Sequence, residues 1–142
     1  MKIALIYWSA TGNTKKMAEA LAEGIVAGGA TAEIFAVDEF DQNNLEAYDG
    51  FFFGCPAMGD EELEEQSFEP FFAEIEGKLK DKPVGLFGSY GWGDGAWMRI
   101  WEQRVKDDGA KLVGEGLIVQ NSPDEEATEK CRDFGKTFLV NI

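Results

Sequence analysis

The sequence contains no histidine, the side chain that most often serves as a general base or a metal ligand. A Ser-His-Asp or Cys-His mechanism of nucleophilic catalysis is therefore excluded. Only two cysteines occur, Cys55 and Cys131, which are too few for a zinc site or a disulfide framework. Cys131 shares a helical face with Ala127, Phe134 and Phe138, so we expect it to be a buried structural residue.

Positive charge is also scarce. Lys and Arg total 13 against 27 Asp and Glu, which gives a formal net charge of −14. From Met17 to Gly77 there is no Lys or Arg at all, while 16 of the acids lie there. This balance disfavours binding to nucleic acids and to anionic membranes, because both need cationic surfaces. It favours protein partners with basic faces.

Long apolar runs are absent. No stretch approaches the ~18 residues of a membrane span, and the apolar start of the chain is too short for a signal peptide. The chain has 142 residues and is 44% hydrophobic, which is enough for one core. We therefore expect one domain covering residues 1–142, a cytoplasmic location and no membrane association.

Strand and helix patterns alternate along the chain. The expected strands are Lys2–Trp8, Thr31–Val37, Asp49–Gly54, Lys82–Gly88 and Lys111–Val119, the last with a bend at Gly114 or Gly116. The expected helices are Asn13–Ala27, Gln42–Tyr48, Phe68–Ile75, Ala96–Lys106 and a final helix that reaches about Val140. Ser122 is the expected N-cap of that final helix, with Pro123 first and Glu125 third in it.

This alternation predicts an α/β fold with a parallel sheet covered by helices on both faces. Ligands of such sheets bind beyond the carboxyl ends of the strands. The loops after the first, third and fourth strands are unusually rich in glycine and polar residues. Because these loops emerge at one edge, we expect them to form a single site.

The first of these loops has the composition of a phosphate-binding loop. Consecutive backbone amides at a helix start bind anions, hydroxyl and amide side chains add donors, and glycine permits close approach. An ordinary polar loop with a capping hydroxyl is the alternative. The motifs for nucleoside triphosphates and for dinucleotides are both absent. The candidate phosphate ligands are Ser9, Ala10, Thr11, Gly12, Asn13 and Thr14.

The pattern S-x-T-G-N-T in this loop resembles the flavin mononucleotide (FMN) phosphate loop of flavodoxins. Segments 54–62 and 88–95 resemble the flavin loops of short-chain, clostridial-type members, and the resemblance extends through Phe-Glu-Pro-Phe at 68–71 and Leu-Ile-Val-Gln-Asn at 117–121. The fifth strand lacks the insertion that marks long-chain members. The resemblance implies a three-layer sandwich with a five-stranded parallel sheet in the order 2-1-3-4-5, and FMN as cofactor.

The resemblance also implies that the second and third loops hold the flavin rings. Trp92 would lie against one ring face and Met58 against the other, where its polarizable sulfur suits an aromatic partner. A core aromatic and a core filler are the alternatives for these two residues. The cofactor-binding residues implied in these loops are Pro56, Ala57, Met58, Gly59, Asp60, Glu61, Ser89, Tyr90, Gly91, Trp92, Gly93 and Asp94.

Particular roles follow from the same resemblance. Glu61 would accept a hydrogen bond from flavin N3–H, and the amides of Gly91 and Trp92 would serve the N1/O2 edge. The Gly59–Asp60 peptide would turn over on reduction, so that its carbonyl accepts a hydrogen bond from N5–H. Pro56 has neither hydroxyl nor N–H, so it has no expected phosphate role. We expect the acids at 62, 64 and 65 to be solvated.

The function implied is that of a low-potential one-electron carrier: a monomer that binds FMN non-covalently and shuttles electrons between basic-faced reductases and oxidases, and not an enzyme. Two alternatives belong to other classes. One is an FMN-dependent quinone or nitro reductase, or a flavodoxin-like module of a larger flavoenzyme. The other is a receiver domain, which is disfavoured because Tyr7-Trp8-Ser9 and Gly54-Cys55 stand where that class has its acidic residues.

Overall fold

The computed structural model describes all of residues 1–142. Its strands are β1 (Lys2–Tyr7), β2 (Thr31–Ala36), β3 (Gly50–Gly54), β4 (Pro83–Tyr90), β5 (Lys111–Leu112) and β6 (Leu117–Gln120). Its α-helices are α1 (Asn13–Ala27), α2 (Phe68–Ile75), α3 (Ala96–Asp107) and α4 (Glu125–Val140), with short 3-10 helices at Val37–Glu39, Gln42–Ala47 and Glu76–Lys78. None of these helices combines the length and the apolar composition that crossing a bilayer requires.

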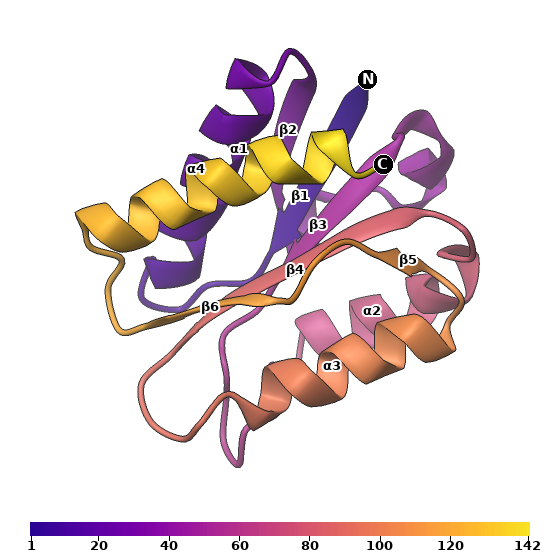
Figure 1. Cartoon of the computed structure of the whole chain (residues 1–142). Helices are drawn as coiled ribbons and strands as arrows, with labels where there is room; N and C mark the ends of the chain where they lie inside the picture. Colours follow the sequence, from indigo (N-terminus) through magenta and orange to yellow (C-terminus); the bar gives the residue numbers. More distant parts are fainter.

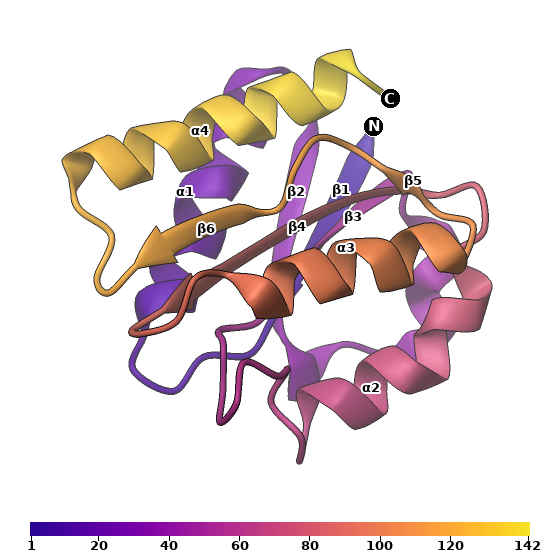
Figure 2. The ribbon, with the colours of Figure 1, turned by 60° about the horizontal axis from the view of Figure 1, so that its bottom comes forward.

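The sheet is parallel throughout and follows the order β2-β1-β3-β4-β5, as predicted. Helices α1 and α4 cover one face, and α2 and α3 cover the other (Figures 1 and 2). The expected three-layer α/β sandwich is therefore confirmed. The chain termini lie side by side at the end of the sheet where β1 begins, so the carboxyl ends of the strands face the opposite way.

The fifth strand position is occupied by two short strands rather than by one bent strand. Both β5 and β6 pair with β4, and after Val113, whose amide still donates to the Val84 carbonyl at 2.8 Å, the chain leaves the sheet until β6 begins. Gly114 has φ +69°, which only glycine adopts readily. The amide of Gly116 donates to Glu102 Oε2 at 2.6 Å instead of to a strand. The expected bend is thus a break in the strand. It is caused by the left-handed conformation of Gly114 and by the Glu102 side chain of α3, which accepts the hydrogen bond of the Gly116 amide.

The predicted start of α4 at Ser122 is wrong. Asp124 is the N-cap, and its carboxylate Oδ1 accepts a hydrogen bond from Ala127 N at 2.8 Å. A carboxylate that accepts a hydrogen bond from the amide three residues ahead stabilises the start of a helix. Its negative charge also interacts favourably with the helix dipole. Pro123 therefore lies outside the helix rather than in its first turn.

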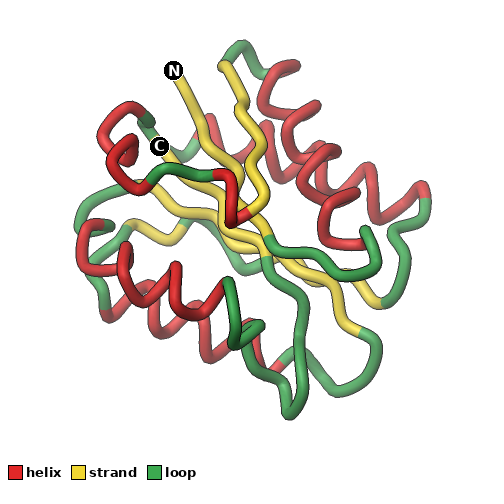
Figure 3. The backbone as a smooth tube through the Cα atoms, turned by 180° about the vertical axis from the view of Figure 1, so that it is seen from behind, coloured by secondary structure: helices red, strands yellow, loops and turns green.

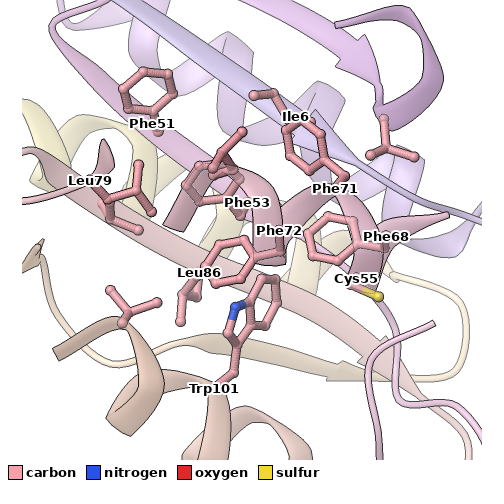
Figure 4. Close-up of a cluster of buried hydrophobic side chains, with 14 of the residues drawn as sticks. Ile6, Phe51, Phe53, Cys55, Phe68, Phe71, Phe72, Leu79, Leu86 and Trp101 are labelled. Carbon is pink, nitrogen blue, oxygen red and sulfur yellow. The ribbon is translucent and has the colours of Figure 1, made fainter. Parts of the chain in front are cut away.

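Phenylalanine dominates the core between the sheet and α2/α3. Figure 4 shows Phe53 of β3 beside Phe72 of α2, with Phe68 of the same helix and Trp101 of α3 on the far side of Phe72 and Phe51 beyond Phe53. Phe53 meets Phe72 edge-on at 5.3 Å between ring centroids. Such pairs add about 0.5–1.5 kcal/mol to the effect of burial. The opposite face is filled from α1 and α4, and Cys131 is fully buried there, as expected.

An ionic network joins α2 to α3 at the surface of this core. The Arg104 guanidinium binds Glu69 and Glu76 at 2.7 Å each and lies over the Phe72 ring. Asp108, at the end of α3, has one carboxyl oxygen that is buried without a partner. Burial first, and then the neighbouring Glu76 carboxylate, raise the pKa of Asp108 to about 6.

This raised pKa predicts a loss of stability as the pH rises. Because the folded state holds the Asp108 proton more tightly than the unfolded chain does, the stabilisation is complete below about pH 4 and is lost as the pH passes about 6. Asp108→Asn, which cannot ionise, should raise the unfolding free energy at pH 7 by about 1 kcal/mol and flatten its decline between pH 4 and 7. Urea denaturation at several pH values measures both. The control Asp133→Asn, at an exposed acid on α4, should leave the pH profile unchanged.

Candidate functional site

The loops after β1, β3 and β4 lie together at one end of the sheet. They are among the green segments at the end remote from the termini in Figure 3. A hollow of about 230 Å³ lies between them. It is lined by Ser9, Ala10, Thr11, Asn13, Thr14, Pro56, Ala57, Met58, Ser89, Tyr90, Gly91 and Asn121.

The first loop presents a row of backbone N–H groups that have no acceptor in the protein. Among the amides of residues 10–15 only that of Gly12 is hydrogen-bonded, to Ser9 Oγ at 3.0 Å. Gly12 has φ +93° and precedes α1, whose first amides have no intrahelical partner. The Ser9 hydroxyl thus holds the loop closed while keeping its own proton free to donate. This arrangement suits an anion.

Two buried hydroxyls lie at the base of the hollow. Thr14 Oγ1 and Ser89 Oγ are 2.9 Å apart, and the two residues are only 1% and 5% exposed. Each hydroxyl carries one proton, so their mutual bond uses one and leaves the other for a ligand. The pair also ties the start of α1 to the end of β4. Both residues are candidate ligands predicted from the sequence, but the bond between them was not predicted.

The second loop is a tight hairpin. Met58 and Glu62 exchange both backbone hydrogen bonds at 2.8 Å, and Gly59 and Glu61 between them have φ +53° and +57°. Positive φ at the non-glycine residue Glu61 is uncommon and marks a constrained turn. A Cβ atom added to Gly59 would meet no atom within 4 Å. The hairpin tip therefore has free space around it.

The Glu61 carboxylate joins the second loop to the third. Its Oε1 accepts a hydrogen bond from Gly95 N at 3.1 Å. A Cβ atom on Gly93 would meet the same oxygen at 2.5 Å, and Gly93 has φ +90°, so only glycine fits there. Glu61 Oε2 has no partner and remains available to a donor.

The bases of these two loops are held together by a buried contact. Trp97 Nε1 donates to the Cys55 carbonyl at 3.1 Å. A side chain on Gly88 would collide with that carbonyl, which explains why the strand carries glycine there. Burial raises the pKa of the Cys55 thiol to about 12, so the thiol stays protonated and structural at neutral pH.

The remaining predicted residues lie around the hollow rather than in it. Trp92 is 65% exposed at the tip of the third loop, so it is not a core aromatic. The amides of Gly91 and Trp92 have no acceptor in the protein. Asp60 is exposed, and the Asp94 carboxylate pairs with Arg99 at the surface.

Asn121 was not predicted as a site residue. It has φ +61°, its amide donates to the Tyr90 carbonyl at 2.7 Å, and its side chain borders the hollow near Gly91. The signal available in the sequence was an asparagine directly after a strand, because asparagine adopts the left-handed conformation more readily than most residues.

A model of the flavodoxin family matches residues 5–135. The chain belongs to the flavodoxin family. A flavodoxin from Clostridium beijerinckii is 51% identical over 97% of this chain and 99% of its own, and one from Megasphaera elsdenii is 43% identical over 94% and 96%. The solution structure of the two-electron reduced Megasphaera elsdenii flavodoxin has a TM-score of 0.87, covering 97% of this chain and 98% of its own.

Membership confirms the short-chain flavodoxin resemblance. Flavodoxins are electron-transfer proteins that carry a flavin, typically FMN, and this chain is one of them rather than an enzyme. The particular residues that hold the cofactor stay a prediction at this point.

Glu64 contradicts the expectation of a solvated acidic loop. Its side chain is 7% exposed, and its carboxylate accepts hydrogen bonds from the amides of Gln66, Ser67 and Phe68, each at 2.8 Å. Ser67, the residue at the N-cap position of α2, makes no side-chain cap of its own. Glu64 therefore caps α2 and fixes the end of the second loop. Glu62 and Glu65 are exposed, as expected.

Burial disfavours the ionised form of Glu64, but the three backbone amides outweigh it, and the pKa of Glu64 is lowered. The ionised Glu64 carboxylate therefore stabilises the fold above the ordinary glutamate pKa of 4.5, and this stabilisation is lost as the pH falls through the pKa of Glu64 in the folded protein. Glu64→Gln should lower the unfolding free energy at pH 7 by about 1.5–3 kcal/mol. Thermal and urea denaturation measure this, and Glu65→Gln, an exposed neighbour, is the control that should have almost no effect.

Proposed function

We propose that the chain is a low-potential one-electron carrier that holds FMN in the hollow and between the second and third loops. When bound, FMN supplies the ability to take up and release electrons singly. The observation that carries the proposal is the row of unpaired amides at the start of α1 beside two buried hydroxyls, Thr14 and Ser89. Backbone and hydroxyl donors that have no acceptor in the protein suit an anionic ligand, and they do not stabilise the fold by themselves.

The phosphate would be held by the residues of the first loop. The amides of Thr11, Asn13 and Thr14 and the hydroxyls of Ser9 and Thr11 would donate to it, in the positive field of the helix start. Lys15 and Lys16 are exposed, so the grip depends on hydrogen bonds rather than on a cation. A hollow of about 230 Å³ is too small for a whole drug-sized ligand, for which pockets of ~300–1,000 Å³ are usual. The rings would accordingly lie beyond it, towards Trp92.

The rings would be held by the other two loops. Met58 and the exposed Trp92 would cover the two ring faces, and Gly91 and Trp92 amides would donate to the N1/O2 edge. Glu61 Oε2 would accept from N3–H while Oε1 keeps its bond to Gly95. Asp60, Asp94 and Gly93 would shape the loops, and Ala57, Ala10 and Tyr90 would line the sugar chain.

The surrounding charge supports a low potential. The second and third loops carry carboxylates at Asp60, Glu61, Glu62 and Asp94, in a protein with a net charge of −14. Negative charge added to a ligand among them is repelled, which lowers the potential of the step that adds it. The same charge supports basic-faced redox partners, whose approach would slow as salt rises. We further propose that the chain acts as one monomeric domain in the cytoplasm.

The purified protein should be yellow. Its apoprotein should bind FMN at least about a hundredfold more tightly than it binds riboflavin, because riboflavin lacks the phosphate and its charge-assisted hydrogen bonds. Absorption and flavin fluorescence titrations measure both affinities, and a potentiometric titration should resolve two one-electron steps. Equal affinity for the two flavins would overturn the phosphate assignment. A single two-electron wave, or direct oxidation of NADPH by the loaded protein, would point to the reductase alternative instead.

A second test addresses the Gly59–Asp60 peptide. We propose that this peptide turns over when flavin N5 is protonated, so that the Gly59 carbonyl accepts a hydrogen bond from N5–H. The open space around Gly59 means that Gly59→Ala adds no clash and changes only backbone preference. Left-handed φ costs a non-glycine residue about 1–2 kcal/mol, and 1.4 kcal/mol corresponds to about 59 mV for one electron. The variant should narrow the separation of the two potentials by tens of millivolts.

Gly77→Ala is the matched control for that substitution. A Cβ atom on Gly77 also meets nothing, but its φ is not positive and it lies outside the three loops. It should leave both potentials unchanged. An unaltered separation in Gly59→Ala would argue against the turning peptide.

A further inference from the structure

We propose that a groove between residues 61–65 and α3 is the docking surface for a basic segment of an electron-transfer partner, one that presents an apolar side chain between lysines or arginines. We call it the glutamate groove. It encloses about 420 Å³ and lies between the second loop and α3. The inference rests on the proposed function and adds the chemistry of the partner to it.

The floor of the groove is apolar. The indoles of Trp97 and Trp101 and the side chain of Leu63 line it. Ile100 stands at its edge with 66% of its surface exposed, although it lies on a helix whose other apolar residues Trp97, Met98, Trp101 and Val105 are buried. An exposed aliphatic residue next to aromatic walls, surrounded by polar groups, is the usual make-up of a contact that binds one apolar side chain.

The rim of the groove is negative. Glu61, Glu62, Glu65 and Glu69 border it, and Arg104 is its single cation. The Arg104 guanidinium is already engaged by Glu69 and Glu76 at 2.7 Å, so it does not offset the rest of the rim. Glu62 and Glu65 are exposed and have no ion-pair partner. The occupant that complements such a rim carries positive charge on both sides of its apolar residue.

The position of the groove suits electron transfer. Glu61 belongs both to the rim and to the hairpin that borders the candidate flavin site, and its Oε1 holds Gly95, the residue before α3. Ile100 lies little more than one turn further along the same helix. A partner seated in the groove would therefore contact the hairpin that borders the candidate flavin site, which keeps the distance to the cofactor short.

The test uses the FMN-loaded protein and two five-residue peptides, each with two pairs of lysine and arginine around a central residue. The central residue is leucine in one peptide and serine in the other. Titrations followed by NMR should move the Ile100 methyl and the Trp97 and Trp101 indole signals, and the leucine peptide should bind about tenfold more tightly, because leucine gains apolar burial.

Matched variants locate the contact. Ile100→Ser should remove the preference for leucine, while Val26→Ser, at an equally exposed aliphatic residue on α1, should keep it. Glu65→Gln should weaken both peptides and make binding less sensitive to salt, while Glu19→Gln, an exposed acid on α1, should do so much less.

Equal binding of the two peptides, or shifts spread over acids outside the groove, would overturn the proposal and leave FMN binding and the redox steps untouched. A colourless protein that does not bind FMN would instead overturn the proposed function, and it would be detected before any peptide is added.

Discussion

The backbone amides left unpaired at the start of α1 are the constraint on which the rest of the site depends. A buried or half-buried N–H group without an acceptor costs about as much as a lost hydrogen bond, and here several gather within one turn. Gly12 and the Ser9 hydroxyl keep the loop in the shape that aims them together, and the Thr14–Ser89 bond anchors that shape to β4. In the proposed function one phosphate would satisfy these donors together.

The same reasoning explains why the loop carries no cation although the protein is strongly acidic. A lysine in the cradle would gain phosphate affinity, but it would also reduce the negative potential around the flavin loops. In the proposed function a neutral loop separates the two tasks, since hydrogen bonds would hold the phosphate while the carboxylates of Asp60, Glu61, Glu62 and Asp94 would lower the potential near the rings. Substitutions in the first loop would then change the affinity for FMN, and substitutions of the carboxylates would change the redox potential independently.

Much of this could be predicted from the sequence, for identifiable reasons. Alternating apolar runs and helical spacing predicted a parallel sheet covered by helices and nearly all element bounds, because both patterns report burial directly. The order of the strands was predicted from the resemblance to flavodoxins and not from these patterns. The meeting of the three loops at one edge was predicted because they follow parallel strands and because their glycines and hydroxyls have no role in a core. The errors share another cause: they concern which of several nearby polar groups takes a particular backbone amide. Asp124 rather than Ser122 caps α4, Glu64 caps α2 from three residues upstream of its N-cap position, and Glu102 takes the amide of Gly116. Which polar group takes an amide depends on distances in three dimensions, and the spacing of residues along the sequence does not specify these distances.

Glu61 shows how one carboxylate can serve the cofactor site and the outer surface together. Its Oε1 fixes the third loop through Gly95, its Oε2 is free for a ligand, and its side chain forms part of the glutamate groove. Gly59 lies two residues before Glu61 in the turn that the two Met58–Glu62 hydrogen bonds close, so the hairpin connects Gly59 to the carboxylate that holds Gly95. If a partner binds the glutamate groove as proposed, it meets the same carboxylate that holds the third loop, so the docking surface and the candidate flavin site share one residue.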